Sequence, residues 1–217
     1  MEIIYLGHSS FKIKGKTATV ITDPYDDKVI GSVFPKSEAE IVTVSHNHDD
    51  HNNVTLVSNT KKVVFGPGEY EIAGVSILGY KTYHDDKKGE TRGDNTIYII
   101  EIDGVRILHL GDLGHELSDS LISEIGDIDV LMIPVGGGYT IGPDDAVKTV
   151  RAVSPKLVIP MHYQVLGMPE TISANLLPVD EFVSKMGGTK EISPKLTIKD
   201  ASLITDQEKL VILEKRQ

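Results

Sequence analysis

The sequence predicts a mixed α/β fold built as one domain over residues 1–217, with sheets packed inside and helices outside. Short β-type runs dominate the first half of the chain, and helical patterns appear mainly in the second half. No linker, internal repeat or low-complexity tract divides the chain into parts. A chain of 217 residues is also long enough to bury a core without disulfide bonds.

The expected strands are short runs rich in branched and aromatic residues, bounded by glycine, proline or polar turn residues. They cover residues 3–6, 11–13, 18–22, 41–44, 63–65, 70–72, 75–83, 96–102, 105–110, 130–134, 157–160, 196–198 and 210–213. The dipeptide Asp103-Gly104 between two of these runs is typical of a two-residue hairpin turn. The runs 130–134 and 157–160 are apolar throughout, as strands buried on both faces are.

Three later segments show helical patterns. Residues 118–125 place apolar side chains on one side and are followed by a glycine. Residues 143–153 begin with proline and two aspartates and carry Arg151 in the last turn, which suits the helix dipole. Residues 178–186 repeat apolar side chains at helical spacing before a glycine. The polar stretch 85–94 predicts a mobile loop.

The charge and residue usage of the chain argue against several classes of function. With 32 acidic and 22 basic residues, the net charge of −10 argues against binding to nucleic acid or anionic membranes. The chain has no cysteine, so it has no disulfide, thiolate metal ligand or cysteine nucleophile. No apolar run approaches the roughly 18 residues that span a membrane, and the first residues show no signal peptide. We therefore expect a cytoplasmic protein.

A histidine-rich loop follows the expected strand that ends at residue 44, and it reads SHNHDDH over residues 45–51. His46 and His48 are two residues apart, so in extended backbone they share one face and can point at one cation. Asp50 and His51 follow after a turn and can face a neighbouring cation. Imidazole and carboxylate groups are ligands of zinc, manganese and iron. The alternative, a solvated polar loop, is disfavoured because the pattern directly follows a buried-type strand.

Further ligand candidates stand at the ends of later expected strands. These are His84, Asp112 and His162. Each by itself is more typical of a turn or surface residue, but strand ends are where such folds gather a site from distant segments. Together with the histidine-rich loop they supply seven ligands, which is enough for two metals.

The order of these motifs resembles the metallo-β-lactamase fold superfamily over nearly the whole chain. Four further strings resemble its metal-dependent hydrolase branch, which includes proteins similar to L-ascorbate-6-phosphate lactonase. They are LGHSSF at residues 6–11, TDP at 22–24, HLGD at 109–112 and IPMHY at 159–163. The resemblance implies a four-layer αββα sandwich with the metals at one edge, between the two sheets.

The resemblance also implies a ligand set. One metal takes His46, His48 and His84, the other takes Asp50, His51 and His162, and Asp112 bridges them. The transfer to His84 is the weakest, because that histidine is located by its position and not by a distinctive string. His109 and His115 compete with it for the third position.

Four residues are candidates for positions beside the metals or the substrate. His8 lies at the site edge by resemblance, or is a hairpin residue. Asp23 accepts the second N–H of a ligand histidine, or caps a turn. His109 is a packed histidine inside a strand if it is not a ligand. His115 lines the substrate mouth or begins a surface helix.

The leading hypothesis is a hydrolase with two divalent metal ions, most readily zinc, with manganese, iron and nickel as alternatives. Two cations about 3.5–4 Å apart can share a hydroxide that attacks a phosphorus or carbonyl carbon. Asp50 and Asp112 can accept or relay protons there. The expected substrate is a small phosphodiester, phosphate ester or lactone. Two alternatives are an oxygen-dependent enzyme with one iron and a non-catalytic metal-binding module.

Two loops are candidates for contact with a phosphorylated small-molecule substrate. The glycine-rich residues 135–143 precede an expected helix N-terminus, which favours anions, unless they are simply a flexible connection. Lys87, Lys88 and Arg92 can meet phosphate or stay solvated. The lack of cysteine and of an inserted domain argues against antibiotic hydrolysis and RNA processing. The sequence does not identify the substrate, the native metal or the oligomeric state.

Overall fold

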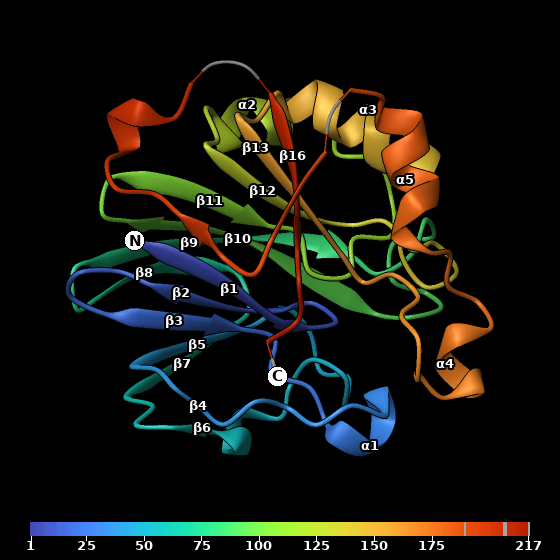
Figure 1. Cartoon of the computed structure of the whole chain (residues 1–217), viewed down its shortest axis with the longest axis horizontal. Helices are drawn as coiled ribbons and strands as arrows, with labels where there is room; N and C mark the ends of the chain where they lie inside the picture. The colour runs from blue at the N-terminus through green and yellow to red at the C-terminus, as the bar shows by residue number, and fades with distance from the viewer. Residues whose placement is uncertain (189, 206–207, 217) are drawn as a thin grey trace.

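A computed structural model describes residues 1–188, 190–205 and 208–216 of the chain. Two β-sheets lie face to face at its centre (Figure 1). The first sheet has six strands in the order β15-β1-β2-β3-β5-β7. The second has eight strands in the order β14-β16-β13-β12-β11-β10-β9-β8, and a small third sheet pairs β4 with β6.

All thirteen expected strands are confirmed, and their ends differ from the expected ones by at most two residues. The six-stranded sheet contains β15 (Leu196–Thr197), β1 (Glu2–Gly7), β2 (Ser10–Lys14), β3 (Thr19–Thr22), β5 (Ile41–Val44) and β7 (Lys62–Phe65). The eight-stranded sheet contains β14 (Lys190–Ser193), β16 (Lys209–Leu213), β13 (Leu157–Met161), β12 (Val130–Pro134), β11 (Val105–His109), β10 (Asp94–Ile102), β9 (Val75–Tyr83) and β8 (Gly68–Ile72). The sequence did not predict β14 or the two-residue strands β4 (Ser37–Glu38) and β6 (Val57–Ser58).

The core lies between the two sheets because alternate side chains of each strand point inward. From the six-stranded sheet, Phe11 and Ile41 are fully buried, and Tyr98 and Met132 meet them from the eight-stranded sheet. The expected hairpin at Asp103-Gly104 is also confirmed, since Ile102 pairs with Val105 and both turn residues have positive φ.

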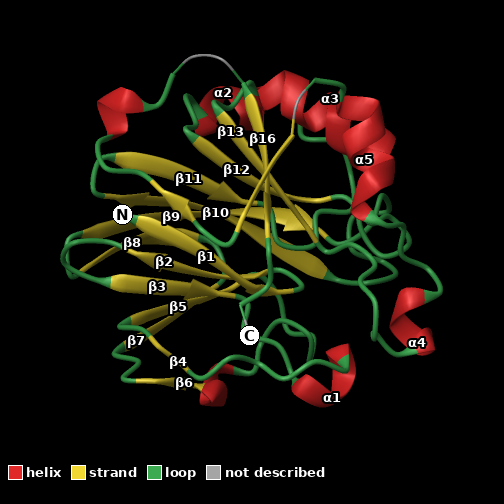
Figure 2. Ribbon diagram, viewed as in Figure 1, coloured by secondary structure: helices red, strands yellow, loops and turns green. Residues whose placement is uncertain are grey.

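Three helices cover the outer face of the eight-stranded sheet (Figure 2). They are α2 (Asp119–Ile125), α3 (Pro143–Val153) and α5 (Val179–Met186), as the sequence predicted. Ser118 caps α2, because its hydroxyl accepts the backbone N–H of Leu121 at 3.3 Å.

The outer face of the six-stranded sheet carries a thinner layer. It consists of α1 (Asp27–Ile30), a 3-10 turn (Val54–Leu56) and the β4–β6 pair, with Tyr25 and Phe34 buried beneath. The sequence predicted neither α1 nor α4 (Glu170–Ser173), since a single helical turn leaves almost no periodicity to detect. The order of layers is the αββα sandwich that the resemblance implied.

The stretch 85–94, expected as a mobile loop, is organised around one carboxylate. Asp85 is only 8% exposed. Its oxygens accept the backbone N–H groups of Lys87, Gly89, Thr91 and Arg92 at 2.8–2.9 Å. The polarity of the sequence therefore reflects a network of hydrogen bonds and not a lack of internal contacts.

The strand directions bring the candidate ligands to one edge of the sandwich. In one sheet β3 and β5 are parallel, and in the other β11, β12 and β13 are parallel. β9 runs in the same direction as β11, because each is antiparallel to β10. The segments after β9, β11 and β13 therefore leave the eight-stranded sheet at the same end. The loop after β5 meets them there, because the ring centroids of His46 and His84 are 4.7 Å apart. Within the described ranges, no helix has the length and apolar character needed to cross a bilayer.

Candidate metal centre

The histidine-rich loop begins where β5 ends, and its direction is set by Asp23. The backbone N–H of Ser45 donates to Oδ1 of Asp23 at 2.8 Å. His46 is then buried, whereas His48 is exposed at the mouth of the site. Their ring centroids are 4.6 Å apart. The two imidazoles therefore meet on one side of the loop, although the backbone there is bent and not extended.

His84 completes the first group of potential ligands. Its ring centroid lies 4.7 Å from that of His46 and 5.1 Å from that of His48. One nitrogen from each of the three rings lies within 4.8 Å of the other two. The end of β9 holds His84 in place, since its backbone N–H donates to the carbonyl of Gly93 at 3.0 Å. This arrangement can hold one cation.

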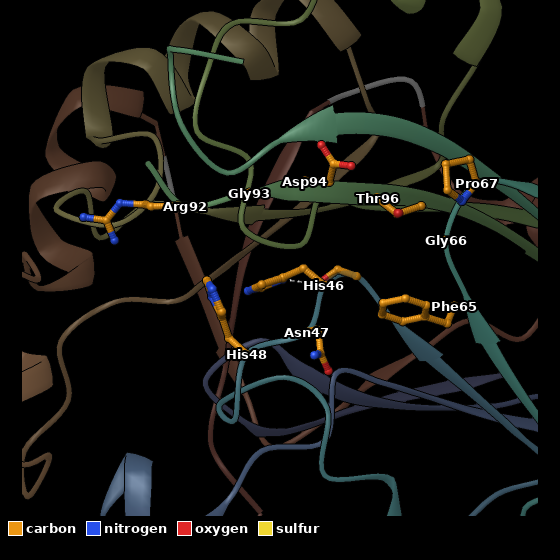
Figure 3. Close-up of a pocket in the computed structure, with 11 residues that line it drawn as sticks. His46, Asn47, His48, Phe65, Gly66, Pro67, Arg92, Gly93, Asp94 and Thr96 are labelled. Carbon is orange, nitrogen blue, oxygen red and sulfur yellow. Dashed lines mark hydrogen bonds between the residues drawn. The ribbon is translucent and has the colours of Figure 1, made fainter. Parts of the chain in front are cut away.

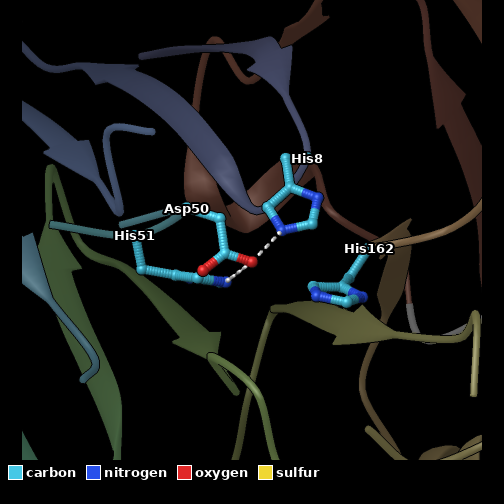
Figure 4. A group of neighbouring side chains, drawn as sticks. All are labelled: His8, Asp50, His51 and His162. Atoms are coloured by element: carbon cyan, nitrogen blue, oxygen red, sulfur yellow. Dashed lines mark hydrogen bonds and ion pairs between the residues drawn. The ribbon is translucent and has the colours of Figure 1, made fainter. Parts of the chain in front are cut away.

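The second group combines Asp50, His51 and His162 with His8, which comes from the turn between β1 and β2 (Figure 4). Nε2 of His8 lies 3.2 Å from Oδ2 of Asp50, and Nε2 of His51 lies 3.7 Å from the same oxygen. Three of the four side chains are buried and Asp50 is half-buried. The group can hold a second cation beside the first.

Asp112 lies between the two groups. Its Oδ2 is 3.2 Å from Nε2 of His84 and 3.1 Å from Nε2 of His162. Its Oδ1 is 3.2 Å from Nε2 of His51. The seven side chains expected as ligands thus converge, with one carboxylate reaching both groups.

Asp23 and Ser45 orient two of the histidines from behind. Oδ2 of Asp23 lies 2.9 Å from Nδ1 of His51 and accepts the Ser45 hydroxyl at 2.6 Å. The same hydroxyl lies 2.9 Å from Nδ1 of His46. Both imidazoles consequently turn their Nε2 atoms toward Asp112, as ligand histidines do when a carboxylate or hydroxyl holds the other nitrogen.

The buried atoms at the centre of the site fit a cation. Nε2 of His46, Nε2 of His51 and Oδ1 of Asp112 are buried and make no hydrogen bond to the described residues, although the last two atoms are 3.2 Å apart. A buried polar atom without a partner costs free energy unless another group satisfies it. Lone pairs that converge from imidazoles and a carboxylate are the donor set of divalent transition metals.

The electrostatics of the site also suit metal binding. Burial would raise the pKa of Asp112, but His162 and His51 outweigh it and hold the pKa well below its usual range. Burial lowers the pKa of His46 to about 3, so this imidazole is neutral at pH 7. Burial disfavours charge on His51, but Asp112 and Asp50 outweigh it and raise its pKa. The two carboxylates therefore draw positive charge to the position between them.

The two competing histidines have other partners. Nε2 of His109 lies 2.8 Å from the carbonyl of Ser9, and its Nδ1 accepts the backbone N–H of Gly111. Nε2 of His115 accepts the backbone N–H of Tyr83, and its Nδ1 lies 2.8 Å from the carbonyl of Glu116. Both nitrogens of each ring are thus engaged with main chain, and neither ring joins the groups around Asp112.

Sequence reasoning missed Asn95, a fully buried residue of β10. Its Oδ1 accepts the backbone N–H of Asp112 at 3.0 Å, and its amide donates to the carbonyl of Leu110 at 3.0 Å. A Cβ on Gly111 would lie 2.5 Å from Oδ1 of Asn95 and from Cβ of Ser45. This close contact therefore requires glycine before Asp112, which explains the Gly-Asp motif. A polar residue at the start of an apolar strand was the one signal in the sequence.

A pocket of about 320 Å³ opens beside the first group of ligands (Figure 3). His46 and His48 form part of its wall, and Phe65, Arg92 and Asp94 form other parts. Phe65 is 57% exposed, which is unusual for a large apolar residue. The pocket gives a small molecule access to the potential metal ligands.

The glycine-rich segment 135–143 does not present its donors to this pocket. The N–H groups of Gly136, Gly137, Tyr139 and Ile141 all donate to carbonyl groups of the chain. A Cβ on Gly136 would lie 2.3 Å from the carbonyl oxygen of His162. That glycine therefore serves close packing, and the four N–H groups named above are not free to bind a phosphate.

Comparison with known proteins agrees with the site. The family model described as a β-lactamase superfamily domain matches residues 2–162. A UPF0173 metal-dependent hydrolase of Symbiobacterium thermophilum is 35% identical over 192 residues, which covers 75% of this chain and 84% of that protein. A UPF0173 metal-dependent hydrolase of Thermococcus onnurineus is 29% identical over 190 residues, with the same shares covered.

Solved structures share the fold. A Thermotoga maritima protein, proposed to be a Zn-dependent hydrolase of the metallo-β-lactamase superfamily, is 36% identical with a TM-score of 0.80. The match covers 98% of this chain and 97% of that chain. The metallo hydrolase Igni18 of Ignicoccus hospitalis is 21% identical with a TM-score of 0.60. This match covers 85% of this chain and 89% of that chain, and it shows the fold alone. The chain belongs to the metallo-β-lactamase superfamily and is one of its metal-dependent hydrolases.

Proposed function

We propose that the chain is a dinuclear hydrolase that cleaves a small phosphodiester, phosphate ester or lactone. His46, His48 and His84 would hold one divalent cation, and Asp50, His51 and His162 would hold the other. The position of Asp112 carries this proposal, because its carboxylate lies 3.1–3.2 Å from imidazole nitrogens of both groups. A site for a single cation would not need a carboxylate that reaches two sets of ligands.

The chemistry follows from the residues that surround the proposed cations. Two divalent cations held here would lower the pKa of a water molecule and stabilise negative charge that develops on the substrate. His51 and His46 are oriented by Asp23 and Ser45, so the ligand geometry is set before any substrate enters. Zinc is the most readily accepted metal, because the ligands are imidazoles and carboxylates and the Thermotoga relative is proposed to be Zn-dependent.

Asp50 and Asp112 would act as ligands and as acceptors of protons. Burial would raise the pKa of Asp50, but the neighbouring His51 and His8 outweigh it and lower the pKa. The pKa of Asp112 is held low in the same way. Both carboxylates are therefore ionised at pH 7, which makes them poor donors of a proton to a leaving group.

Elemental analysis of the untagged full chain tests the proposal. We expect about two equivalents of zinc or manganese per chain and a clear loss in Asp112→Ala. Asp144→Ala is the matched control, since Asp144 is an exposed residue of α3 that pairs with Lys185 at 2.8 Å. About one equivalent of iron, or no metal after reconstitution, would overturn the dinuclear assignment.

A hydrolysis assay tests the reaction itself. The metal-loaded chain is expected to cleave bis(p-nitrophenyl) phosphate or simple lactones, and a chelator should abolish this activity until metal is returned. A chain that holds two metals and cleaves neither class of compound would contradict the reaction and favour a metal-binding module.

A further inference from the structure

The side chain of Arg92 links two loops at the rim of the proposed centre. Its guanidinium carbon lies 4.8 Å from the ring centroid of Tyr139, which is a stacked arrangement. Its Nη2 donates to the carbonyl of Gly138 at 3.2 Å. A guanidinium has five N–H donors, and this is its one hydrogen bond to the described part of the chain. Most of its donors are available to a ligand.

Both partners of this stack are held in place by the surrounding chain. The backbone N–H of Arg92 donates to Asp85 at 2.8 Å, which anchors the loop below the guanidinium. The hydroxyl of Tyr139 accepts the side-chain amide of Asn175 at 2.8 Å and donates to the carbonyl of Thr171 at 3.1 Å. Little conformational entropy would be lost when a ligand binds to groups that are fixed in advance.

The stack lies next to both groups of metal ligands. Arg92 lines the same pocket as His46 and His48, and Figure 3 shows these histidines between Arg92 and Phe65. On the other side, the ring centroid of Tyr139 is 6.5 Å from that of His162. When the reacting end of a small molecule lies at the proposed cations, the guanidinium of Arg92 is therefore within reach of the other end of that molecule.

The positive charge of the Arg92 guanidinium is not neutralised by neighbouring side chains. No carboxylate of the described residues lies within ion-pair distance of its guanidinium, and Asp94 of the same pocket is paired with Lys81 at 2.8 Å. No residue of the glycine-rich segment lines this pocket, and most of the backbone N–H groups of the segment donate to carbonyl groups of the chain. Among the rim groups that the sequence suggested for an anion, Arg92 is thus the one with free donors in the pocket.

We propose that Arg92, stacked on Tyr139, binds a carboxylate or phosphate group of the substrate that is separate from the bond that is cleaved. This inference rests on the proposed hydrolase function. It narrows the substrate to a small ester or lactone with a charged group several bonds from the reacting centre. A guanidinium can meet either anion with two parallel hydrogen bonds, which a lysine cannot do.

A matched pair of substrates tests this recognition in the metal-loaded full chain. The pair is methyl p-nitrophenyl phosphate and its 2-carboxyethyl counterpart, which differ in a distal carboxylate. We expect the wild type to prefer the carboxylated compound. Arg92→Met should reduce kcat/KM for that compound by about tenfold to a hundredfold and reduce kcat/KM for the methyl compound by a much smaller factor.

Lys87→Met is the matched control, because Lys87 is an exposed cation of the same loop and does not line the pocket. An equal loss in Lys87→Met would show a general effect of charge and would overturn the inference. An equal loss on both substrates in Arg92→Met would do the same, since it would show a structural defect and not recognition of the anion.

Chemical modification separates this inference from the proposed function. The chain has arginines at 92, 106, 151 and 216, so phenylglyoxal adducts are easily assigned by peptide mapping. In the chelator-treated full chain, inorganic phosphate should slow modification of Arg92 several-fold and leave exposed Arg151 unaffected. Protection of Arg92 without hydrolysis of phosphodiesters, phosphate esters or lactones would support anion binding by Arg92 and contradict the proposed function. Hydrolysis without protection or charge preference would overturn the inference alone.

Discussion

His8 and His162 come from segments far apart in the chain and are in contact through both backbone and side chain. The backbone N–H of His162 donates to the carbonyl of His8 at 3.0 Å, and their ring centroids are 4.1 Å apart. Both residues adopt positive φ, at 53° and 52°. Such backbone is costly for residues other than glycine, and it clusters at functional sites. This contact ties the first sheet to the second at the edge where the proposed metals bind.

From this contact we predict that His8→Ala weakens the second metal site. The variant loses the 3.2 Å contact with Asp50 and the packing on His162, so both ligands are less well positioned. Zinc affinity at one of two sites should fall by about tenfold to a hundredfold in a calorimetric titration. His115→Ala is the control, because that ring lies outside the ligand groups. Two sites of unchanged affinity in His8→Ala would show that His8 plays no part in metal binding.

A second prediction concerns Asp23, whose carboxylate orients the potential ligand histidines. Asp23→Asn should lower zinc affinity by about tenfold to a hundredfold, because the amide cannot replace the charge beside Nδ1 of His51. Asp23→Ala should also lower the free energy of unfolding by about 3–5 kcal/mol, since it leaves buried partners unpaired. Asp49→Ala serves as the control, as Asp49 is an exposed acid of the histidine-rich loop. Wild-type affinity in Asp23→Asn would refute the orienting role.

Gly111 allows the close packing beneath Asp112, and a methyl group there should be poorly tolerated. Gly111→Ala combines positive φ with contacts of 2.5 Å to Asn95 and Ser45. The free energy of unfolding in urea should fall by about 2–4 kcal/mol. Gly126→Ala isolates the effect of φ, because Gly126 has positive φ and nothing within 4 Å of its Cβ position. Equal losses in the two variants would show that the close contact relaxes without cost.

The loop that carries Arg92 should open when Asp85 loses its charge. Burial would raise the pKa of Asp85, but the four backbone N–H groups outweigh it and lower the pKa to about 2. Because this value lies below the ordinary pKa of 3.8, the stabilisation is complete above about pH 4 and is lost as the pH falls toward 2. Hydrogen exchange at residues 87–92 should be faster in Asp85→Ala than in the wild type at pH 7. Asp86→Ala, an exposed neighbour, should leave the exchange unchanged.

If Asp85→Ala retained the full protection of residues 87–92, the loop would be held by contacts other than this carboxylate. Protection in the wild type that disappeared already at pH 5 would contradict the lowered pKa. Such an outcome would also remove the argument that Arg92 is fixed before a ligand binds.

The sequence by itself determined thirteen of the described strands, the three longer helices and the family of the fold. Alternating or continuous apolar runs such as those at 130–134 and 157–160 depend only on neighbouring residues, so they can be read without the tertiary structure. The spacing of His46, His48, Asp50 and His51 is local in the same way. The short helix α1 and the thin layer around it were missed, because single turns are stabilised by packing and not by periodicity.

The tertiary structure decided which residues surround the potential ligands. The sequence left His84, His109 and His115 as competitors, and only the packing of the two sheets shows which ring faces Asp112. His8 reaches Asp50 and Arg92 reaches Tyr139 through contacts between segments far apart in the chain. Such contacts depend on how whole sheets and loops pack together, and no pattern of neighbouring residues encodes that relationship.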